Sequence, residues 1–175
     1  GAGSREYGTP AMGFLDGWRF CPRCAAEGEH RGDHFVCQAC GHVVWSNPVP
    51  GVHALIECDG KVLLGRRAFN PGAGCWGLPG GFLEETEEPA AGLRREVAEE
   101  TGLEVEVDGL FGTWLQAHGE RTVLCLIYRA RVVGGVEQAA DDVTELAWFG
   151  PDNLPQDVGP SAFADAVSAW RQQHP

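Results

Sequence analysis

The chain has 175 residues, enough for one ordinary domain with a small addition. It carries 25 acidic against 13 basic residues, a formal net charge of −12, so it lacks the basic surface of a general nucleic-acid or anionic-membrane binder. An apolar fraction of 43% is that of a globular protein, and no apolar run is long enough to cross a bilayer. We therefore expect a cytoplasmic protein with no nucleic-acid or membrane partner.

Residues 1–17 are interpreted as lying outside the functional part of the chain. Met12 is the only methionine and is interpreted as the natural start, so residues 1–11 are expected to be an appended segment, followed by a short N-terminal tail. We predict two further parts, a metal-binding ribbon over residues 18–46 and a larger α/β domain over residues 47–175.

Two C-x-x-C pairs dominate the ribbon: Cys21 with Cys24, and Cys37 with Cys40. Cysteines in a chain without an export signal favour thiols and metal ions over disulfides. Two such pairs at this spacing strongly indicate a tetrahedral Zn²⁺ site that stabilises a segment too short and polar to fold on a core. We therefore predict a structural Zn²⁺ ion bound by the four cysteines. A thioredoxin-like redox pair is the alternative, but it needs only one such motif.

Within the ribbon we expect a polar loop over residues 25–33 and a short strand over residues 34–36. Its basic and acidic residues balance, which favours a structural or dimer-forming role over nucleic-acid binding and leaves a homodimer open. Three cysteines lie outside the ribbon. We expect Cys58 and Cys125 to be buried strand residues, whereas Cys75, before a glycine-rich turn, has no assigned role.

The larger domain begins with a predicted hairpin. Strands over residues 50–57 and 61–67 are joined by Asp59–Gly60, a strong two-residue turn signal. Arg66 and Arg67 end the second strand and point towards a glutamate-rich segment, where an arginine could bind a substrate phosphate. A solvent-exposed strand end is an equally weighted interpretation. Trp76, after a Pro/Gly loop, is expected in the core.

A helix is predicted over residues 90–101. Pro89 suits the first turn of a helix, and Gly102 suits the left-handed residue just past its end. At about 100° per residue, Glu96, Glu99 and Glu100 lie within one sector of the helix roughly 100° wide. An apolar sector beside them can pack on a core.

Strands and one more helix complete the predicted fold. The strands are expected over residues 104–107, 110–115, 122–132 and 145–149, with His118–Gly119 as a turn and Gly134–Gly135 as a break. Residues 160–173 are predicted to form an amphipathic helix with Phe163, Val167 and Trp170 on one face. One central and one terminal helix on a mixed sheet give an α/β class fold, an α/β/α sandwich.

The clustered glutamates indicate a metal site. Three neighbouring carboxylates repel one another unless a cation lies between them, and oxygen ligands suit Mg²⁺ or Mn²⁺ better than Zn²⁺. Such an ion beside carboxylates indicates phosphate chemistry. A solvated acidic helix face is the alternative, but the upstream glycines and Arg95 favour a functional site. Glycine lets a backbone carbonyl approach a metal, and arginine can hold a glutamate in one rotamer.

From Gly81 to Leu103 the chain spells G-x5-E-x7-R-E-V-x-E-E-x-G-L. This segment resembles the Nudix box, the catalytic signature of the Nudix hydrolases, at every fixed position. The resemblance covers residues 49 to about 173 and implies the Nudix-type sandwich. The ribbon is similar to the N-terminal zinc element of NADH pyrophosphatases and of a shorter group that acts on FAD or ADP-ribose.

The resemblance also implies roles for single residues. Glu96, Glu99 and Glu100 become Mg²⁺ ligands or the general base, and the Gly80 carbonyl a further ligand. Arg95 and Glu87 become the pair that orients the cluster. The base remains open between Glu96 and Glu99, with the region from Asp141–Asp142 to Glu145 as a further source.

The segment after the box carries no marker of a particular substrate. It lacks the proline-rich motif of NADH pyrophosphatases, the proline of many ADP-ribose hydrolases and the tyrosine of dinucleoside polyphosphate hydrolases. The resemblance implies a Mg²⁺-dependent pyrophosphohydrolase that cleaves a nucleoside diphosphate linked to another moiety, with FAD or ADP-ribose as first substrates and NADH next. The alternative is a module that senses or binds nucleotides without turnover.

Overall fold

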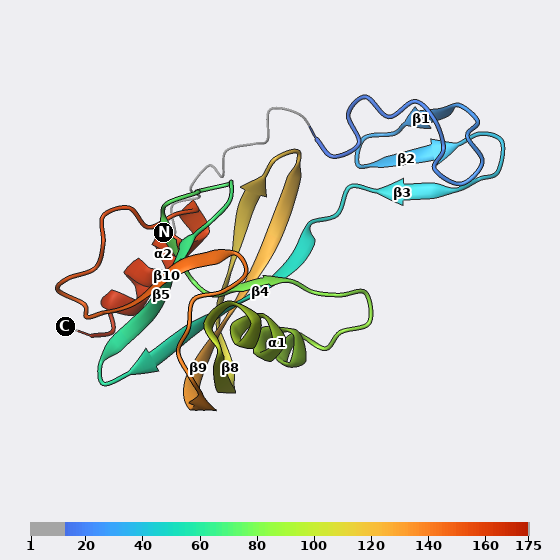
Figure 1. Cartoon of the computed structure of the whole chain (residues 1–175). Helices are drawn as coiled ribbons and strands as arrows, with labels where there is room; N and C mark the ends of the chain where they lie inside the picture. The colour runs from blue at the N-terminus through green and yellow to red at the C-terminus, as the bar shows by residue number, and fades with distance from the viewer. Residues whose placement is uncertain (1–12, 175) are drawn as a thin grey trace. The chain divides into compact units, whose positions relative to one another are not determined.

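The structure is a computed structural model and describes residues 13–174. Met12 and the segment interpreted as appended lie outside these residues. The chain divides into two compact units (Figure 1). One contains the described residues up to Val49 together with Ala117–Thr122, and the other contains Pro50–Gln116 and the residues from Val123 onwards.

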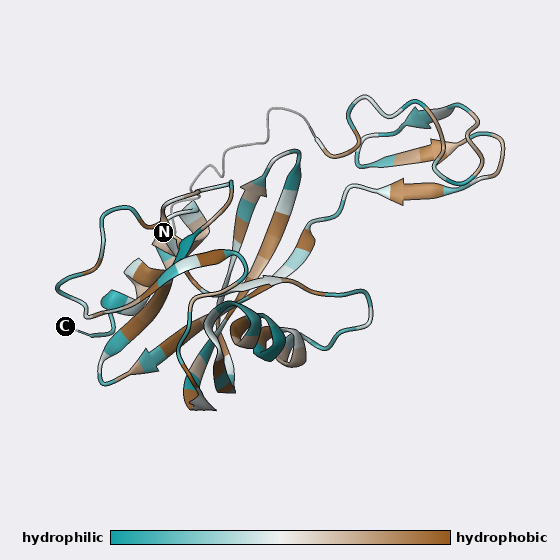
Figure 2. Cartoon of the chain, viewed as in Figure 1, coloured by the Kyte–Doolittle hydropathy of each residue, from teal (hydrophilic) through white to brown (hydrophobic). Residues whose placement is uncertain are grey.

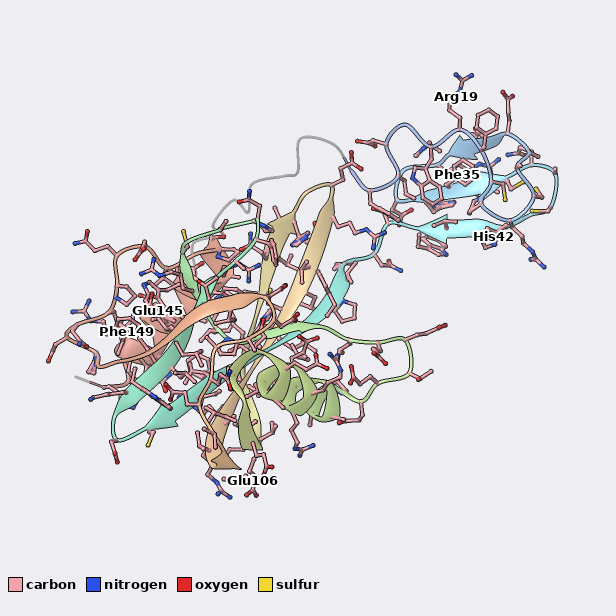
Figure 3. The ribbon with its side chains drawn as sticks, in the orientation of Figure 1. Arg19, Phe35, His42, Glu106, Glu145 and Phe149 are labelled. Carbon is pink, nitrogen blue, oxygen red and sulfur yellow. The ribbon has the colours of Figure 1, made fainter. Side chains whose placement is uncertain are left out.

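The smaller unit contains a three-stranded antiparallel sheet in the order β1-β2-β3. The strands are β1 (Gly28–His30), β2 (His34–Cys37) and β3 (Val43–Trp45). The predicted strand at residues 34–36 is therefore confirmed, but the loop predicted over residues 25–33 is wrong where β1 runs. That strand is polar because its side chains mostly face solvent, so its sequence carries no apolar signal. Phe35, labelled in Figure 3, is fully buried in a small core with Leu15 and two cysteines.

The larger unit is built on one sheet in the order β10-β5-β4-β9-β8, with two short strands added. Trp76–Gly77 (β6) pairs with β5, and Gly80–Phe82 (β7) pairs with β4. The long strands are β4 (Val49–Cys58), β5 (Lys61–Arg67), β8 (Leu103–His118), β9 (Arg121–Gly135) and β10 (Val143–Phe149). The helices are α1 (Pro89–Thr101) and α2 (Ser161–Arg171).

Each helix covers its own face of this sheet. Alternate side chains of a strand point to opposite faces. Accordingly Val52, Ala54 and Ile56 of β4 pack in one core with Leu93 and Val97 of α1. Leu55 packs in a second core with Phe163, Val167 and Trp170 of α2. The predicted α/β/α sandwich on a mixed sheet is therefore confirmed, and Figure 2 shows the apolar residues concentrated on the sheet strands.

Some predicted details differ from the structure. The strands expected at residues 104–107 and 110–115 are one strand, β8, because Gly109 at φ +156° lets the chain continue through this point. The break expected at Gly134–Gly135 lies inside the end of β9. Cys58 is exposed rather than buried, because it ends β4 next to the turn, whereas Cys125 is buried as predicted.

Two further observations complete the fold. Trp76 is only 5% exposed, so its predicted place in the core is confirmed. Neither helix in residues 13–174 is long and apolar enough to cross a membrane.

Candidate functional site

Helix α1 carries the glutamates and is fixed at both ends. Glu88 is the N-cap and accepts a hydrogen bond from the Ala90 N–H at 2.9 Å, and Pro89 follows as the first helical residue. Gly102 ends the helix at φ +67° with its N–H donating to the Ala98 carbonyl at 3.0 Å. Since Leu93 and Val97 are fully buried between these ends, the rotation of the helix is fixed as well.

Arg95 connects the carboxylates around it. Its Nε and Nη2 donate to the two oxygens of Glu87 at 2.9 and 2.8 Å, which is a bidentate pair. Its Nη1 donates to Glu96 Oε1 at 2.7 Å and to Glu99 Oε2 at 3.3 Å. The hydrogen bonds from Arg95 lower the pKa of Glu87 to about 2. Glu87 and Arg95, paired in the sequence prediction, therefore lie in direct contact and hold the Glu96 side chain in place.

The three metal-ligand candidates of α1 lie in different environments. Glu100 is only 5% exposed and accepts a hydrogen bond from the Gly80 N–H at 2.7 Å. Burial raises its pKa to about 8, and the nearby carboxylates of Glu96 and Asp142 act in the same direction. Burial also raises the pKa of Glu96, whereas the Glu99 side chain is 53% exposed. A buried carboxylate with one backbone donor beside other carboxylates is a site that favours a cation.

Two glycines of β7 bring the backbone close to these carboxylates. Gly80 has φ +139°, and a Cβ atom there would lie 2.1 Å from the Val52 carbonyl oxygen. A Cβ on Gly81 would lie 2.4 Å from Glu96 Oε2. Gly80 therefore requires glycine, whereas a side chain at Gly81 would displace the Glu96 carboxylate. The absence of both side chains lets β7 lie close to β4 and to the glutamates.

The donor set fits a hard divalent cation, although the three carboxylates do not converge. Within residues 13–174, the four ribbon cysteines are the one set of three or more potential ligands whose donor atoms all lie within 4.8 Å of one another. The glutamates of α1 do not meet this distance. The glutamates instead each accept hydrogen bonds from Arg95 or Gly80. Carboxylate oxygens with an adjacent backbone carbonyl are ligands that Mg²⁺ and Mn²⁺ prefer.

The two candidate phosphate-binding arginines at the end of β5 differ in their contacts. Arg66 pairs with Glu145, labelled in Figure 3, at 2.9 Å and with Asp157 at 3.6 Å, and its guanidinium lies 4.5 Å from the ring centroid of Trp76. Arg67 donates from Nε to the Pro71 carbonyl at 2.9 Å. Its two terminal nitrogens have no hydrogen-bond partner within the described part of the chain. Arg67 is close enough to Glu100 to lower that carboxyl's pKa.

His53 lies beside the candidate site, and sequence reasoning missed it. It is 6% exposed, and its partner across the β4–β7 pairing is Gly80. Burial, followed by the positive charge of Arg67, lowers its pKa to about 3, so the imidazole is neutral at ordinary pH. The one signal in the sequence is a polar residue at an inward position of an otherwise apolar strand.

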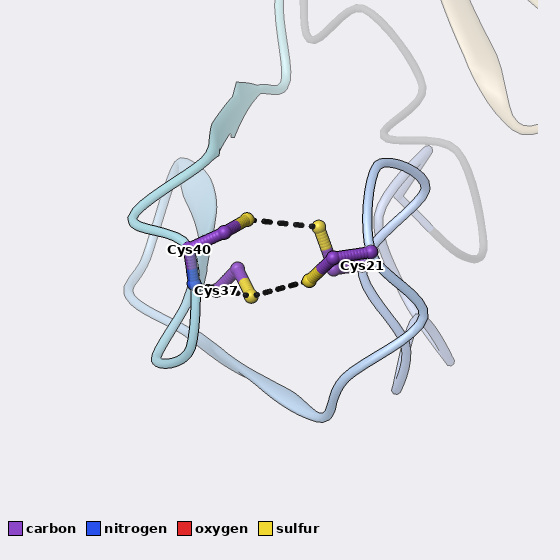
Figure 4. A group of neighbouring side chains, drawn as sticks. Cys21, Cys37 and Cys40 are labelled. Carbon is purple, nitrogen blue, oxygen red and sulfur yellow. Dashed lines mark hydrogen bonds between the residues drawn. The ribbon is translucent and has the colours of Figure 1, made fainter.

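The four ribbon cysteines converge as predicted (Figure 4). Cys21 and Cys40 have their Sγ atoms 3.7 Å apart, and those of Cys24 and Cys37 are 3.5 Å apart. Tetrahedral thiolates at about 2.3 Å from Zn²⁺ lie about 3.8 Å from one another, so the arrangement fits that ion. The Cys40 backbone N–H lowers the pKa of the Cys37 thiol to about 6, which favours the thiolate that a metal binds.

A family model for the NUDIX domain matches residues 47–168 of the chain. A NUDIX hydrolase from Nitrosomonas europaea superimposes with a TM-score of 0.77 at 28% identity, covering 89% of this chain and 92% of that one. A MutT NUDIX hydrolase from Burkholderia pseudomallei gives a TM-score of 0.65 at 31% identity, covering 70% and 97%.

Curated relatives differ in their names. A MutT-like protein of Streptomyces ambofaciens is 43% identical over 100 residues, covering 57% of this chain and 62% of that protein. The ADP-ribose pyrophosphatase of Methanocaldococcus jannaschii is 36% identical over 115 residues, covering 65% and 68%. An NAD-capped RNA hydrolase, NudC, of Haemophilus influenzae is 24% identical over 150 residues, covering 82% and 56%. The chain thus spans between 56% and 68% of the length of these relatives.

Proposed function

The chain belongs to the Nudix hydrolase family, and we propose that it is a Mg²⁺-dependent pyrophosphohydrolase that cleaves the diphosphate of a nucleoside diphosphate linked to another moiety. The observation that carries this proposal is the arrangement around α1. Two carboxylates lie beside the glycine backbone of β7. That of Glu100 is buried, and that of Glu96 is held in place by Arg95. An acidic helix face without function would expose all of its carboxylates to solvent.

Glu96, Glu99, Glu100 and the Gly80 carbonyl would hold the metal ion. When bound, Mg²⁺ would neutralise the charge of the diphosphate and activate water. Arg95 supports this site by keeping Glu96 in one rotamer while its bidentate contact with Glu87 keeps the guanidinium itself in place. We assign Arg67 to a substrate phosphate, because its terminal nitrogens are unpaired within residues 13–174.

The reaction proposed is attack of water on one phosphorus of the diphosphate. A phosphorus–oxygen bond forms with the water oxygen, the bond to the bridging oxygen breaks, and a carboxylate accepts the proton. Glu96 and Glu99 are the candidates for this base. Burial raises the pKa of Glu96, which favours it as a proton acceptor, whereas the Glu99 side chain is more exposed to water.

The substrate class is proposed from the relatives and from the ribbon. The ADP-ribose pyrophosphatase of M. jannaschii supports ADP-ribose, and the name of NudC supports substrates that contain a dinucleotide. ADP-ribose and FAD are therefore the first substrates to test, with NADH next. The ribbon is proposed to bind one structural Zn²⁺ through its four cysteines and to stabilise its own fold rather than act in the reaction.

The test is a substrate panel with Mg²⁺ that measures AMP, FMN and nicotinamide mononucleotide as products. Release of AMP from ADP-ribose or FAD is the expected result. The alternative, a nucleotide-binding module without turnover, predicts binding of the same compounds in calorimetry but no product. Binding without product for the whole panel, in the presence of Mg²⁺ or Mn²⁺, would refute the proposed enzyme activity.

A further inference from the structure

The imidazole of His53 is a buried polar group that the fold itself leaves unpaired. Its Nδ1 is inaccessible to solvent and has no hydrogen-bond partner within residues 13–174. Buried polar groups in proteins are nearly always paired, so an unpaired one requires a reason. Packing alone does not supply it, because an apolar side chain of similar size would fill this place in β4 without loss of hydrogen bonds to water.

The surroundings of the ring place it beside the candidate metal site. Its strand partner is Gly80, and a Cβ atom on Gly80 would lie 3.0 Å from Nδ1. The same Gly80 binds Glu100 through its N–H. On its other side the ring meets Phe163 of α2 edge to face, with centroids 4.6 Å apart. His53 is thus held between the strand that supports the metal ligands and the first turns of α2.

A second glycine lies next to the other ring nitrogen. A Cβ atom on Gly51, two residues along β4 on the same face, would lie 3.3 Å from Nε2, 3.1 Å from Val123 Cγ1 and 3.5 Å from the Gly81 carbonyl oxygen. A side chain at Gly51 would therefore press on the imidazole. Each ring nitrogen of His53 consequently lies next to a glycine, Gly80 or Gly51.

We propose that His53 is a specificity-determining residue whose imidazole hydrogen-bonds a ribose hydroxyl of the bound nucleotide. This inference rests on the proposed function, because Glu100 and Gly80 then place the diphosphate next to β7. The ribose is the first hydrogen-bonding group beyond the diphosphate on the nucleoside side. Its hydroxyls both donate and accept, so they can pair with a neutral imidazole through either nitrogen. A phosphate, which only accepts at neutral pH, is better matched to Arg67.

The experiment measures the affinity of AMP, 2′-deoxy-AMP and 3′-deoxy-AMP by calorimetry for the full chain and its variants. AMP contains no phosphoanhydride, so the measurement does not depend on turnover. In the wild type we expect AMP to bind about tenfold more tightly than one of the two deoxy compounds, the effect of one hydrogen bond. His53→Phe keeps an aromatic ring but loses both nitrogens and is expected to bind AMP and that deoxy compound equally. The same ratio in kcat/KM is expected for ADP-ribose and its corresponding deoxy analogue.

Two conservative variants report which nitrogen is used. Asparagine places a polar atom near the position of Nδ1 and glutamine near that of Nε2, so one of His53→Asn and His53→Gln is expected to retain part of the discrimination. Trp170→Phe is the control, because Trp170 carries the other buried unpaired nitrogen, in the core under α2, and should leave the ratio unchanged.

The outcomes separate the two proposals. An AMP preference that is the same in wild type and His53→Phe overturns the ribose contact, even if the enzyme turns over. A loss of AMP affinity in His53→Phe with an unchanged ratio would mean that His53 acts on a part of the nucleotide other than the ribose hydroxyl, and also overturns it. A ratio that depends on His53 in a protein that cleaves nothing would uphold the ribose contact while the proposed hydrolase activity fails.

Discussion

At the scale of single residues, Glu100 differs from the other glutamates of α1 because it is buried and bound to the backbone of β7. Glu100→Gln keeps the shape of the side chain, and its amide oxygen can still accept from the Gly80 N–H. We expect the variant to be folded and, without Mg²⁺, at least as stable as the wild type, because a buried carboxylate is removed. With Mg²⁺ the rate should fall by about 10²–10³-fold, as measured by product release.

Glu85→Gln is the matched control for this variant. Glu85 is exposed in the loop before α1 and lies outside the fixed positions of the box, so its loss removes the same charge without touching the cluster. It should keep the full rate. Turnover of Glu100→Gln close to the wild-type value at saturating Mg²⁺ would remove Glu100 from the metal ligands.

The two arginines at the end of β5 provide a second comparison between residues. Arg67→Ala should raise KM by about 10- to 100-fold, the effect of one charge-assisted hydrogen bond, with little change in Tm. Arg66→Ala should instead lower Tm, because it leaves Glu145 and Asp157 without their partner and uncovers Trp76. The measurements are steady-state kinetics and thermal unfolding. The opposite assignment of the two effects would move the phosphate contact to Arg66.

At the scale of elements, α1 contains a glycine that opposes helix formation and yet is required by its neighbours. A Cβ atom on Gly92 would lie 2.7 Å from Glu87 Oε2 and 2.5 Å from Leu83 Cδ2. Gly92→Ala should favour the helix by about 1 kcal/mol but displace Glu87 from Arg95. We expect Tm to be unchanged or higher and kcat to fall by about tenfold or more, because the cluster loses its orientation.

Ala91→Gly tests the same element in the opposite sense. Ala91 is exposed on α1, so the substitution weakens the helix without reaching the Glu87–Arg95 pair. It should lower Tm and leave kcat unchanged. If both substitutions altered kcat in proportion to Tm, helix stability rather than the position of Glu87 would explain the effect.

The ribbon is the second element with a measurable prediction. Protein purified without chelator should contain about one zinc ion per chain by metal analysis. Cys37→Ser should lose this zinc and expose the ribbon to proteolysis, because Cys37 is both a ligand and part of the small core. Cys58→Ser, at an exposed cysteine outside the cluster, should retain zinc. Finding the four cysteines disulfide-bonded and free of zinc would contradict the metal site.

The elements that sequence predicts well are those with a strong local signal. Proline, glycine and apolar spacing define α1, and Asp59–Gly60 defines the β4–β5 turn. β1 and β7 carry no such signal, since one is polar and the other is mostly glycine, and each forms by pairing with a neighbouring strand. Gly134–Gly135 is a local signal for a break, but β9 continues to Gly135 because it pairs with its neighbouring strands.

The positions of the site residues along the chain were predictable from the sequence, but their burial and their partners were not. The spacing of the box identifies Glu87, which precedes α1, and Arg95 and the three glutamates, which lie on it. It does not show that Glu100 is buried while Glu99 is exposed, or that Arg66 and Arg67 differ in their partners. These properties depend on residues such as Gly80, Glu145 and Asp157, which are distant from the helix in sequence.

At the scale of the whole molecule, Glu100 links the stability of the fold to pH. Its pKa is about 8 when folded against 4.5 in the unfolded chain, so the folded state binds the proton more tightly between these values. Stability without Mg²⁺ should therefore fall as pH rises through this range. His53 acts in the opposite sense, but only below its unfolded pKa of 6.5.

The measurement compares the Tm of zinc-loaded protein without Mg²⁺ at pH 6.5 and pH 8, a window in which His53 contributes little and contributes equally to the wild type and to Glu100→Gln. The wild type should lose stability over this window relative to Glu100→Gln, because the variant has no carboxyl group to titrate there. Parallel curves for the two proteins would show that Glu100 is ionised in the folded state across the window, contrary to its burial.

The two-sided use of β4 has a consequence for how such a protein can change over evolutionary time. Val52, Ala54 and Ile56 support the helix that bears the glutamates, whereas Gly51, His53 and Leu55 face α2. Substitutions at alternate positions of one strand therefore act on separate tasks. Under the two proposals above, a lineage can acquire a new substrate through the residues that face α2 while those beneath α1 continue to preserve the hydrolytic chemistry.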